Sequence, residues 1–264
     1  MFSFAERLGV DWDRFVGDGD APGLIQGVNR MVGWVFLLCA VWVPWVDGRS
    51  KWTPLWVVAA SAALVLMSLA KYVGAQGQLP MFVEHGGQML TPLALFLCLR
   101  FGASSPVTVA FGVVAVLATF AGHGAYAIGF WPTPANYYGM TTAIFHWSES
   151  GTTFFLRSVG LLDYLVCVGL FVPRLRRASV LYAVVWGALT ALARPVAGMS
   201  SDVRLWGADQ YLHECFLRAP HFLLPMYLYF VWGAGKRDSV SDPRDETAEP
   251  DGSNAARLTR GVGS

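Results

Sequence analysis

Charged residues are scarce in this sequence. Asp, Glu, Lys and Arg make up 14% of its 264 residues, whereas soluble domains carry about 25%. Hydrophobic residues make up 55%, so the chain has too little charge to cover a water-soluble globule. The formal net charge is only +1, and no basic stripe is interleaved with aromatic residues, which argues against a role in binding nucleic acid.

Paired cysteines and the common catalytic motifs are also missing. The four cysteines lie singly in or beside apolar segments, so we expect neither a disulfide framework nor a CxxC site. No Walker loop, GxGxxG turn before a helix or GxSxG elbow occurs, and nucleotide-driven chemistry therefore has no support. HExxH, HxxxH and CxxCH are absent too, so any metal or haem site would have to be assembled from separate segments.

Long apolar runs are what the sequence has instead. A helix crosses a bilayer with about 20 apolar residues, and the runs predict an all-α, polytopic transmembrane bundle. Prolines mark many boundaries, and Pro220 and Pro225 predict a kink in the last span. The seven predicted spans are 27–46, 54–73, 80–100, 106–130, 152–173, 178–194 and 209–232.

The ends of the chain differ from this central part. In residues 1–26, apolar side chains at helical spacing predict an amphipathic helix in the membrane interface. Residues 27–235 form the predicted transmembrane domain, and the polar residues 236–264 are expected to be disordered. The basic cluster RLRR at 174–177 predicts a multi-pass cell-membrane protein with a cytoplasmic C-terminus.

Ionisable residues inside the predicted spans are the most informative feature, because each costs several kcal/mol to place in a bilayer (roughly 2.5–3.5 on insertion scales). The spans that carry them begin or end at loops two, four and six, which lie on one side of the membrane. All five histidines therefore fall towards the same, non-cytoplasmic face. The polar residues are Glu84, His85 and Gln88 in the third span, His123 in the fourth, His146 and Glu149 in loop four, Arg157 and Asp163 in the fifth, and His213, Glu214, Arg218 and His221 in the seventh.

Several of these residues also have simpler interpretations. Glu214 and Arg218 are spaced as an i,i+4 ion pair that would stabilise their own helix. Arg157 and Asp163 fall on different helical faces and would pair with other helices. His146 lies in the aromatic, proline-containing loop 131–151, which we expect in the membrane interface, and it would there serve only as an anchor.

Two stretches resemble a known family. RSVGLLDYLVCVGLFVPRLRRASVLYAVVWGALTALAR, residues 157–194, has a helix ending in GLF, a basic turn and an alanine-rich helix, and it resembles the helix pair of DoxX-like bacterial membrane proteins. Residues 84–114 have a similar layout. The resemblance covers about a third of the chain. It implies a helical membrane protein, in some cases a subunit of a quinone-linked oxidoreductase, and it assigns no functional residue.

The leading functional hypothesis is a pocket lined by histidine and glutamate in the outer half of the bilayer. It would bind haem, a transition metal or a quinone-like molecule for redox chemistry or electron transfer. The predicted cofactor-binding residues are His85, His123, His213 and His221, and the predicted metal ligands are His85, His123, His213, Glu84 and Glu214.

Two alternatives stay open at this point. One is a proton-coupled transporter of a small molecule, in which the same acids and histidines carry protons. The other is an accessory subunit whose polar groups only hold its own helices together. The expected partners are the lipid bilayer and either a membrane redox partner or a small-molecule substrate.

Overall fold

A computed structural model describes residues 20–199 and 208–238, together with residues 6 and 9. Every element in these ranges is helical. Most of the predicted interfacial segment 1–26 and nearly all of the predicted tail 236–264 lie outside the described residues. The elements are α3 (Asp20–Trp42), η1 (Val43–Trp45), α4 (Thr53–Gly74), α5 (Leu79–Val83), α6 (Gly86–Phe101), α7 (Pro106–Ile128), α8 (Ala135–Phe145), α9 (Glu149–Gly169), α10 (Arg176–Ala197), α11 (Ala208–Leu217) and α12 (Pro220–Asp238).

Five helical segments in the described part are long and apolar enough to cross a membrane: α4, α5 with α6, α7, α9 and α10. At 1.5 Å per residue, their 21 to 23 residues match a hydrocarbon layer about 30 Å thick. They coincide with the second to sixth predicted spans, so the sequence-based prediction of a polytopic helical membrane protein is confirmed to that extent. The first and seventh predicted spans remain predictions.

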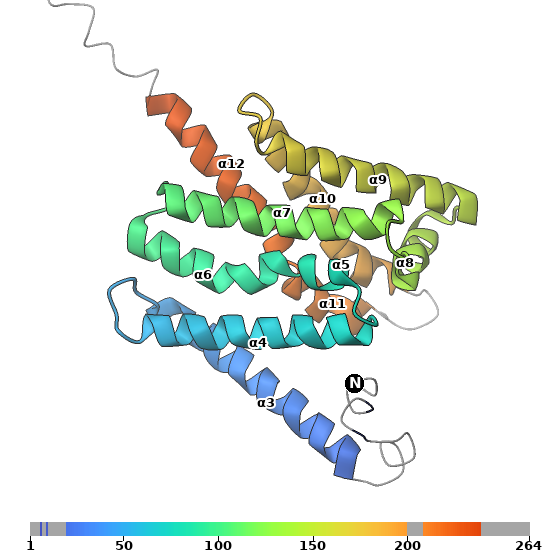
Figure 1. Cartoon of the computed structure of the whole chain (residues 1–264), viewed down its shortest axis with the longest axis horizontal. Helices are drawn as coiled ribbons and strands as arrows, with labels where there is room; N and C mark the ends of the chain where they lie inside the picture. The colour runs from blue at the N-terminus through green and yellow to red at the C-terminus, as the bar shows by residue number, and fades with distance from the viewer. Residues whose placement is uncertain (1–5, 7–8, 10–19, 200–207, 239–264) are drawn as a thin grey trace, which may run out of the picture.

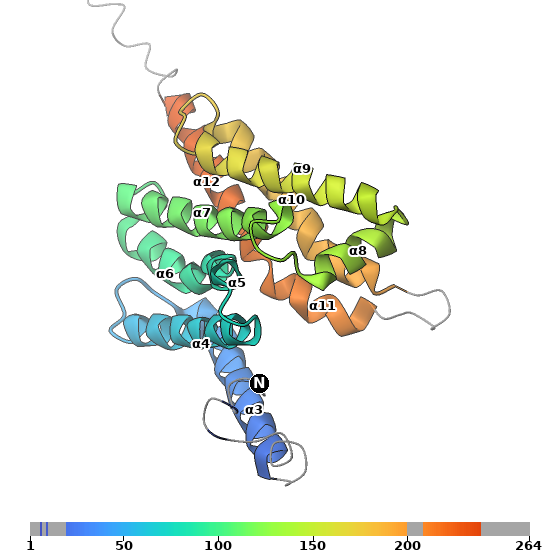
Figure 2. The same cartoon turned by 45° about the vertical axis from the view of Figure 1, so that its right-hand side comes forward.

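The central helix of the bundle is α7, which packs against α5, α6, α9 and α12. Figures 1 and 2 show it between α6 and α9. Small residues let neighbouring backbones approach α7 closely, as is common between membrane helices. Ala115 and Val116 of α7 lie in the main apolar core with Val180 of α10 and Leu228 of α12.

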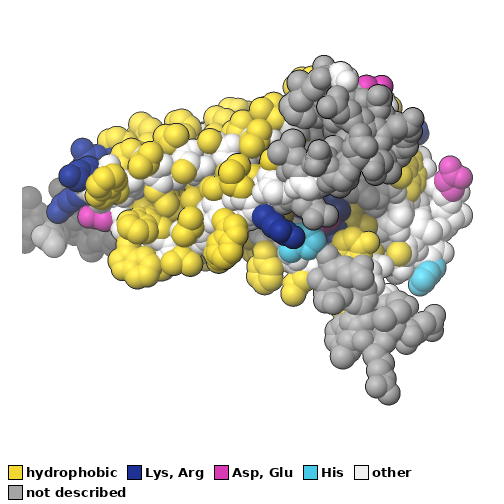
Figure 3. Space-filling view, turned by 90° about the horizontal axis from the view of Figure 1, so that it is seen from below, with side chains coloured by type: hydrophobic (Ala, Val, Ile, Leu, Met, Phe, Trp, Pro, Cys, Tyr) yellow, Lys and Arg dark blue, Asp and Glu magenta, His cyan; other side chains and the backbone are white. Residues whose placement is uncertain are grey.

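The outer surface of the helices is strongly apolar. Figure 3 shows one face on which hydrophobic side chains cover much of the described surface; several basic side chains gather at one end, and another lies beside a histidine further along. Exposed large side chains include Trp34 on α3, Phe154 on α9 and Phe230 on α12. Such a surface suits contact with lipid rather than water.

Two of the predicted spans are interrupted where polar residues lie. The third breaks at Glu84 and His85, between α5 and α6. The seventh is two helices, because the chain leaves the helix after Leu217 and α12 begins at Pro220. A proline at the first helical position lacks only an N–H that would be unpaired there anyway, and α12 continues through Pro225. The predicted distortion at the prolines therefore takes the form of a break before Pro220.

The short helices α5, α8 and α11 lie towards one end of the bundle (Figure 1). Helix α8 lies in the segment 131–151, which the sequence predicted as an interfacial loop. The segment is partly helical, and Tyr137 and Thr141 of α8 are buried. Helices α8 and α11 both pack against α10, and α5 packs against α7. The short helices thus pack against the long helices α7, α9 and α10. The candidate site lies in this part of the bundle.

Candidate functional site

A histidine and a buried aspartate form a short polar contact between α7 and α9. His123 Nδ1 on α7 lies 2.7 Å from Asp163 Oδ2 on α9, and the Asp163 side chain is fully buried. The helices approach closely here because Gly124 faces Asp163 and the carbonyl oxygen of Gly160. A carboxylate accepts only, so Nδ1 carries the shared hydrogen and Nε2 of a neutral His123 remains an acceptor.

Glu84 lies in the break between α5 and α6 and is buried against α7. Gly122 of α7 touches the Glu84 backbone so closely that any side chain at position 122 would overlap with it. The Tyr137 hydroxyl on α8 donates to Glu84 Oε2 at 2.9 Å. Burial, together with the neighbouring Glu84 charge, holds the pKa of Tyr137 well above its usual value. The phenol therefore stays a hydrogen-bond donor at neutral pH.

Next to Glu84, His85 connects the site to the surface. Its Nδ1 lies 2.7 Å from the Met81 carbonyl oxygen and must donate to it. Its Nε2 lies 3.0 Å from the Nζ of Lys71 on α4. The carbonyl fixes the tautomer with hydrogen on Nδ1, so the Lys71 ammonium donates to Nε2. A lysine at the exposed surface of α4 thus contacts a buried histidine beside Glu84.

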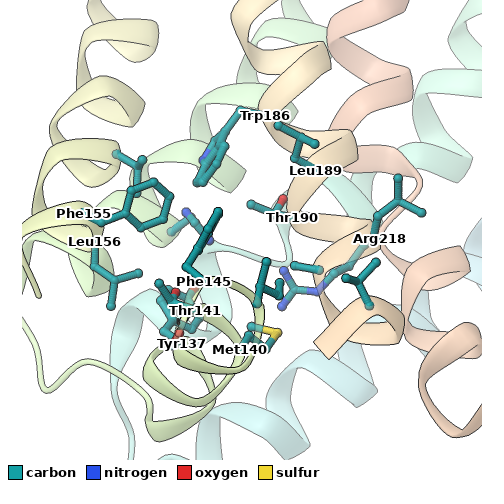
Figure 4. Close-up of a pocket in the computed structure, with 16 residues that line it drawn as sticks. Tyr137, Met140, Thr141, Phe145, Phe155, Leu156, Trp186, Leu189, Thr190 and Arg218 are labelled. Carbon is teal, nitrogen blue, oxygen red and sulfur yellow. Dashed lines mark hydrogen bonds between the residues drawn. The ribbon is translucent and has the colours of Figure 1, made fainter. Parts of the chain in front are cut away.

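Between α8, α9 and α10 lies a cavity of about 310 Å³. Most of its wall is apolar, and Figure 4 shows aromatic and aliphatic side chains around it, with the Arg218 guanidinium pointing in from the side of α11 and α12. His123 and Tyr137 also line it, and their rings are 5.0 Å apart. The lining residues are His123, Tyr137, Met140, Thr141, Ile144, Phe145, Phe155, Leu156, Val159, Trp186, Leu189, Thr190, Leu192, Ala193, Val196 and Arg218.

Six of the predicted polar residues are buried at this end of the bundle, and the His123 side chain is 13% exposed; the six are Glu84, His85, Gln88, Asp163, Arg218 and His221. Gln88 Nε2 donates to the Leu217 carbonyl oxygen at 2.7 Å and so links α6 to the end of α11. His221 Nδ1 has no hydrogen-bond partner among the described residues. Of the residues in this group, His123 and Arg218 line the cavity.

Other predicted site residues do not join them. His146, Glu149, Arg157 and His213 are exposed. His146 ends α8 and Glu149 begins α9, where the chain is at the surface. Arg157 and His213 lie on exposed faces of α9 and α11. These four residues belong to the predicted set but take no part in the cavity.

Glu214 also differs from its prediction as an i,i+4 partner of Arg218. Its Oε2 lies 2.6 Å from Nη1 of Arg194 on α10, because α11 packs along α10 and brings that guanidinium closer. Arg218 instead turns towards the cavity. Tertiary packing thus overrides the pairing that helical spacing alone favours.

The five predicted metal ligands are therefore not brought together as a set. His213 is exposed and Glu214 is bound by Arg194. Within residues 20–199 and 208–238, no group of three or more His, Cys, Asp or Glu side chains is placed to hold a metal ion. Of the predicted ligands, His123 is the one that lines the cavity.

Sequence reasoning missed Tyr137, Lys71 and Arg194 as parts of the site. In the sequence, Tyr137 is only one of the aromatic residues of the loop 131–151, and Lys71 and Arg194 lie near the ends of the predicted spans 54–73 and 178–194. A weak signal existed for the two basic residues, since each ends an apolar span on the side where the histidines lie. Nothing in the sequence distinguished Tyr137 from Tyr138.

Comparisons with family models, with curated proteins and with solved structures found no match for this chain. The resemblance to DoxX-like proteins therefore stays a prediction, and the site must be interpreted from its own geometry.

Proposed function

We propose that this protein binds a quinone-like molecule in the cavity between α8, α9 and α10 and exchanges a proton with it at His123, in support of redox chemistry or electron transfer. The observation that carries the proposal is the cavity itself: an apolar space of about 310 Å³ whose polar lining includes His123, held by the buried Asp163. Cavities that bind small molecules typically combine apolar walls with a few convergent polar groups and start at about 300 Å³.

The walls suit a ring and its apolar substituents. Phe155, Trp186 and Leu189 offer flat and aliphatic surface, and the apolar outer face of the bundle would let a lipid-soluble molecule approach from the bilayer. At the polar end, Nδ1 of His123 is engaged with Asp163, so Nε2 is the ring nitrogen that would contact the ligand.

That arrangement suits proton exchange. Oxidation of a quinol to a quinone would release two protons and two electrons. His123 Nε2 would accept one proton while Asp163 stabilises the imidazolium that forms, and the second proton would pass to water. The electrons would pass to a membrane redox partner. The Tyr137–Glu84 hydrogen bond beside His123 would fix the orientation of the neighbouring polar wall.

Haem and a transition metal fit the geometry less well. Either would need several of the predicted ligands to converge, and only His123 among them reaches the cavity. A cavity at the small end of the usual range also suits a single ring better than a macrocycle. Of the three predicted ligands, haem, a transition metal and a quinone-like molecule, we therefore retain the quinone-like molecule.

The finer topology belongs to the same proposal. We take 27–46 and 209–232 as the first and seventh spans and residues 1–26 as an interfacial segment. The basic turn at 174–177 then lies in the cytoplasm together with the C-terminus. With this orientation in the cell membrane, the cavity lies in the outer half of the bilayer.

Proton-coupled transport is a second candidate, favoured by one specific observation. Lys71, His85, Glu84 and Tyr137 form a series of polar contacts from the surface of α4 to the cavity wall, with Lys71–His85 and Glu84–Tyr137 contacts of 3.0 and 2.9 Å. Transport predicts pH-dependent uptake into proteoliposomes that weakens in Glu84→Gln. Uptake that is unchanged in this variant would remove Glu84 from the mechanism.

Binding of a radiolabelled short-chain benzoquinone to the purified full chain in lipid nanodiscs tests the main proposal. We expect His123→Ala to weaken binding about tenfold or more, as for loss of a hydrogen bond worth at least ~1.4 kcal/mol. Ala193→Trp should abolish binding by filling the cavity that Ala193 lines. His146→Ala is the matched control, since His146 is exposed. Binding that neither His123→Ala nor Ala193→Trp alters would contradict the proposal.

A further inference from the structure

Arg218 is a buried cation with no role in the proton exchange. It occupies the break between α11 and α12, its residue is 7% exposed, and it lines the cavity. In Figure 4 its guanidinium points into the cavity, away from its own backbone. The sequence predicted it as a partner of Glu214, which the structure assigns to Arg194 instead.

Among the described residues, no carboxylate neutralises the Arg218 charge at close range. The three contacts of a carboxylate with a basic side chain found there join Glu84 to His85, Asp163 to His123 and Glu214 to Arg194, and none includes Arg218. A buried guanidinium is strongly unfavourable unless it is paired and hydrogen-bonded. The cavity that it faces is otherwise mostly apolar.

The backbone around Arg218 is held in place from two sides. Gln88 of α6 donates to the carbonyl oxygen of Leu217, the residue before it. Gly187 of α10 lies directly against the His221 carbonyl group, three residues after it. The break that carries Arg218 is therefore clamped between α6 and α10, which limits how far the guanidinium can withdraw from the cavity.

We infer that the molecule bound in this cavity is an amphiphile with an anionic head, a carboxylate or a phosphate, which Arg218 binds through paired hydrogen bonds. The planar guanidinium presents parallel N–H donors that match two oxygens of either group. The apolar walls take the rest of the ligand, and His123 contacts its head from α7. This inference rests on the cavity of the proposed function being a binding site, and it assigns that cavity an anionic ligand class in place of a neutral quinone-like molecule.

Amphiphile and anion are separable properties, and four probes distinguish them. Dodecanoate and dodecyl phosphate carry both an apolar chain and a charge, dodecanol carries the chain alone, and inorganic phosphate carries the charge alone. Each probe, unlabelled, competes with radiolabelled dodecanoate for binding to the purified full chain in nanodiscs of neutral lipid. We expect dodecanoate or dodecyl phosphate to bind about tenfold or more tightly than dodecanol, and inorganic phosphate not to compete.

Three variants assign this preference to Arg218. Arg218→Gln should bind the anionic and the neutral probe equally, and Arg218→Lys should retain a reduced preference, because lysine keeps the charge without the paired donors. Arg157→Gln, which removes an exposed arginine from α9, should behave as the native chain.

Measurements on the native chain decide whether the cavity prefers an anionic ligand, even if Arg218→Gln does not fold. Equal binding of dodecanol and dodecanoate by the native chain would overturn the inference, as would a full preference in Arg218→Gln. Competition by inorganic phosphate as strong as that by dodecyl phosphate would overturn the amphiphile and indicate a water-soluble anion.

The quinone experiment separates the two proposals. Tight binding of the neutral benzoquinone without any preference for the anionic probes would leave the proposed function standing and refute this inference. An Arg218-dependent preference for the anionic probes, with no binding of benzoquinone, would support this inference and refute the proposed function. Failure of all probes in the native chain would refute both.

Discussion

Replacing His123 with leucine tests how much the buried polar pair contributes to the bundle. The substitution fills a similar space but leaves the Asp163 carboxylate, which is fully buried, without its 2.7 Å partner. Its other oxygen, Oδ1, has no partner among the described residues. An N–H···O distance of 2.7 Å lies at the short end, where charge-assisted hydrogen bonds are found.

Two magnitudes compete here. A neutral hydrogen bond between membrane helices contributes on average about 0.6 kcal/mol and at most about 1.7 kcal/mol. Removing one partner of a buried ion pair costs about 3–5 kcal/mol, because the remaining charge has nothing to neutralise it. The short contact favours the second value, so we expect His123→Leu to lower the free energy of unfolding by about 3–5 kcal/mol.

Equilibrium unfolding in mixed micelles with increasing fractions of denaturing detergent, followed by circular dichroism, measures this change. His146→Leu is the control, and since His146 is exposed it should change the stability by less than about 0.5 kcal/mol. The double variant His123→Leu with Asp163→Leu removes both partners and should be more stable than His123→Leu alone. A loss below about 1 kcal/mol in His123→Leu, or a double variant less stable than the single one, would refute the reasoning.

Three further predictions concern the surroundings of the cavity. Gly122→Ala should destabilise the bundle by about 1–3 kcal/mol, since the added methyl meets the Glu84 backbone, whereas Gly139→Ala, which meets nothing within 4 Å, should leave the same unfolding midpoint unchanged or raise it. Tyr137→Phe should destabilise by about 1–3 kcal/mol through loss of the hydrogen bond to Glu84, and a change under about 0.5 kcal/mol would count against that bond. The raised pKa of Tyr137 means that above about pH 10 the unfolded phenol ionises while the folded one does not. Native stability should therefore fall more steeply with rising pH than that of Tyr137→Phe, and parallel pH profiles would contradict the raised pKa.

Much of the fold follows from the sequence because the bilayer leaves few choices. A backbone in hydrocarbon must satisfy its own hydrogen bonds, so a long apolar run becomes a helix. Five predicted spans accordingly coincide with long apolar helices. The same rule identified Glu84 and Asp163, which are buried, as site candidates, since a polar side chain within such a run usually faces the interior. Arg157 of the fifth span is an exception, because it is exposed.

Which of those residues meet was beyond the sequence. The side of the membrane on which a residue lies follows from span order, but its direction around the helix axis depends on packing. Thus His213 shares the end of the bundle with His221, yet one is exposed and the other is buried. Glu214 pairs with Arg194 rather than Arg218 because α11 lies along α10.

The sequence by itself determined that this is a helical membrane protein with ionisable residues gathered towards one end, because hydrophobic length and the energy of burying charge are properties of the chain alone. The tertiary structure decided that His123 is oriented by Asp163, that Tyr137 reaches Glu84, and that Arg218 faces an apolar cavity. The residues of the first contact are 40 positions apart in the sequence and those of the second are 53 apart, and only the packing of whole helices brings such residues together.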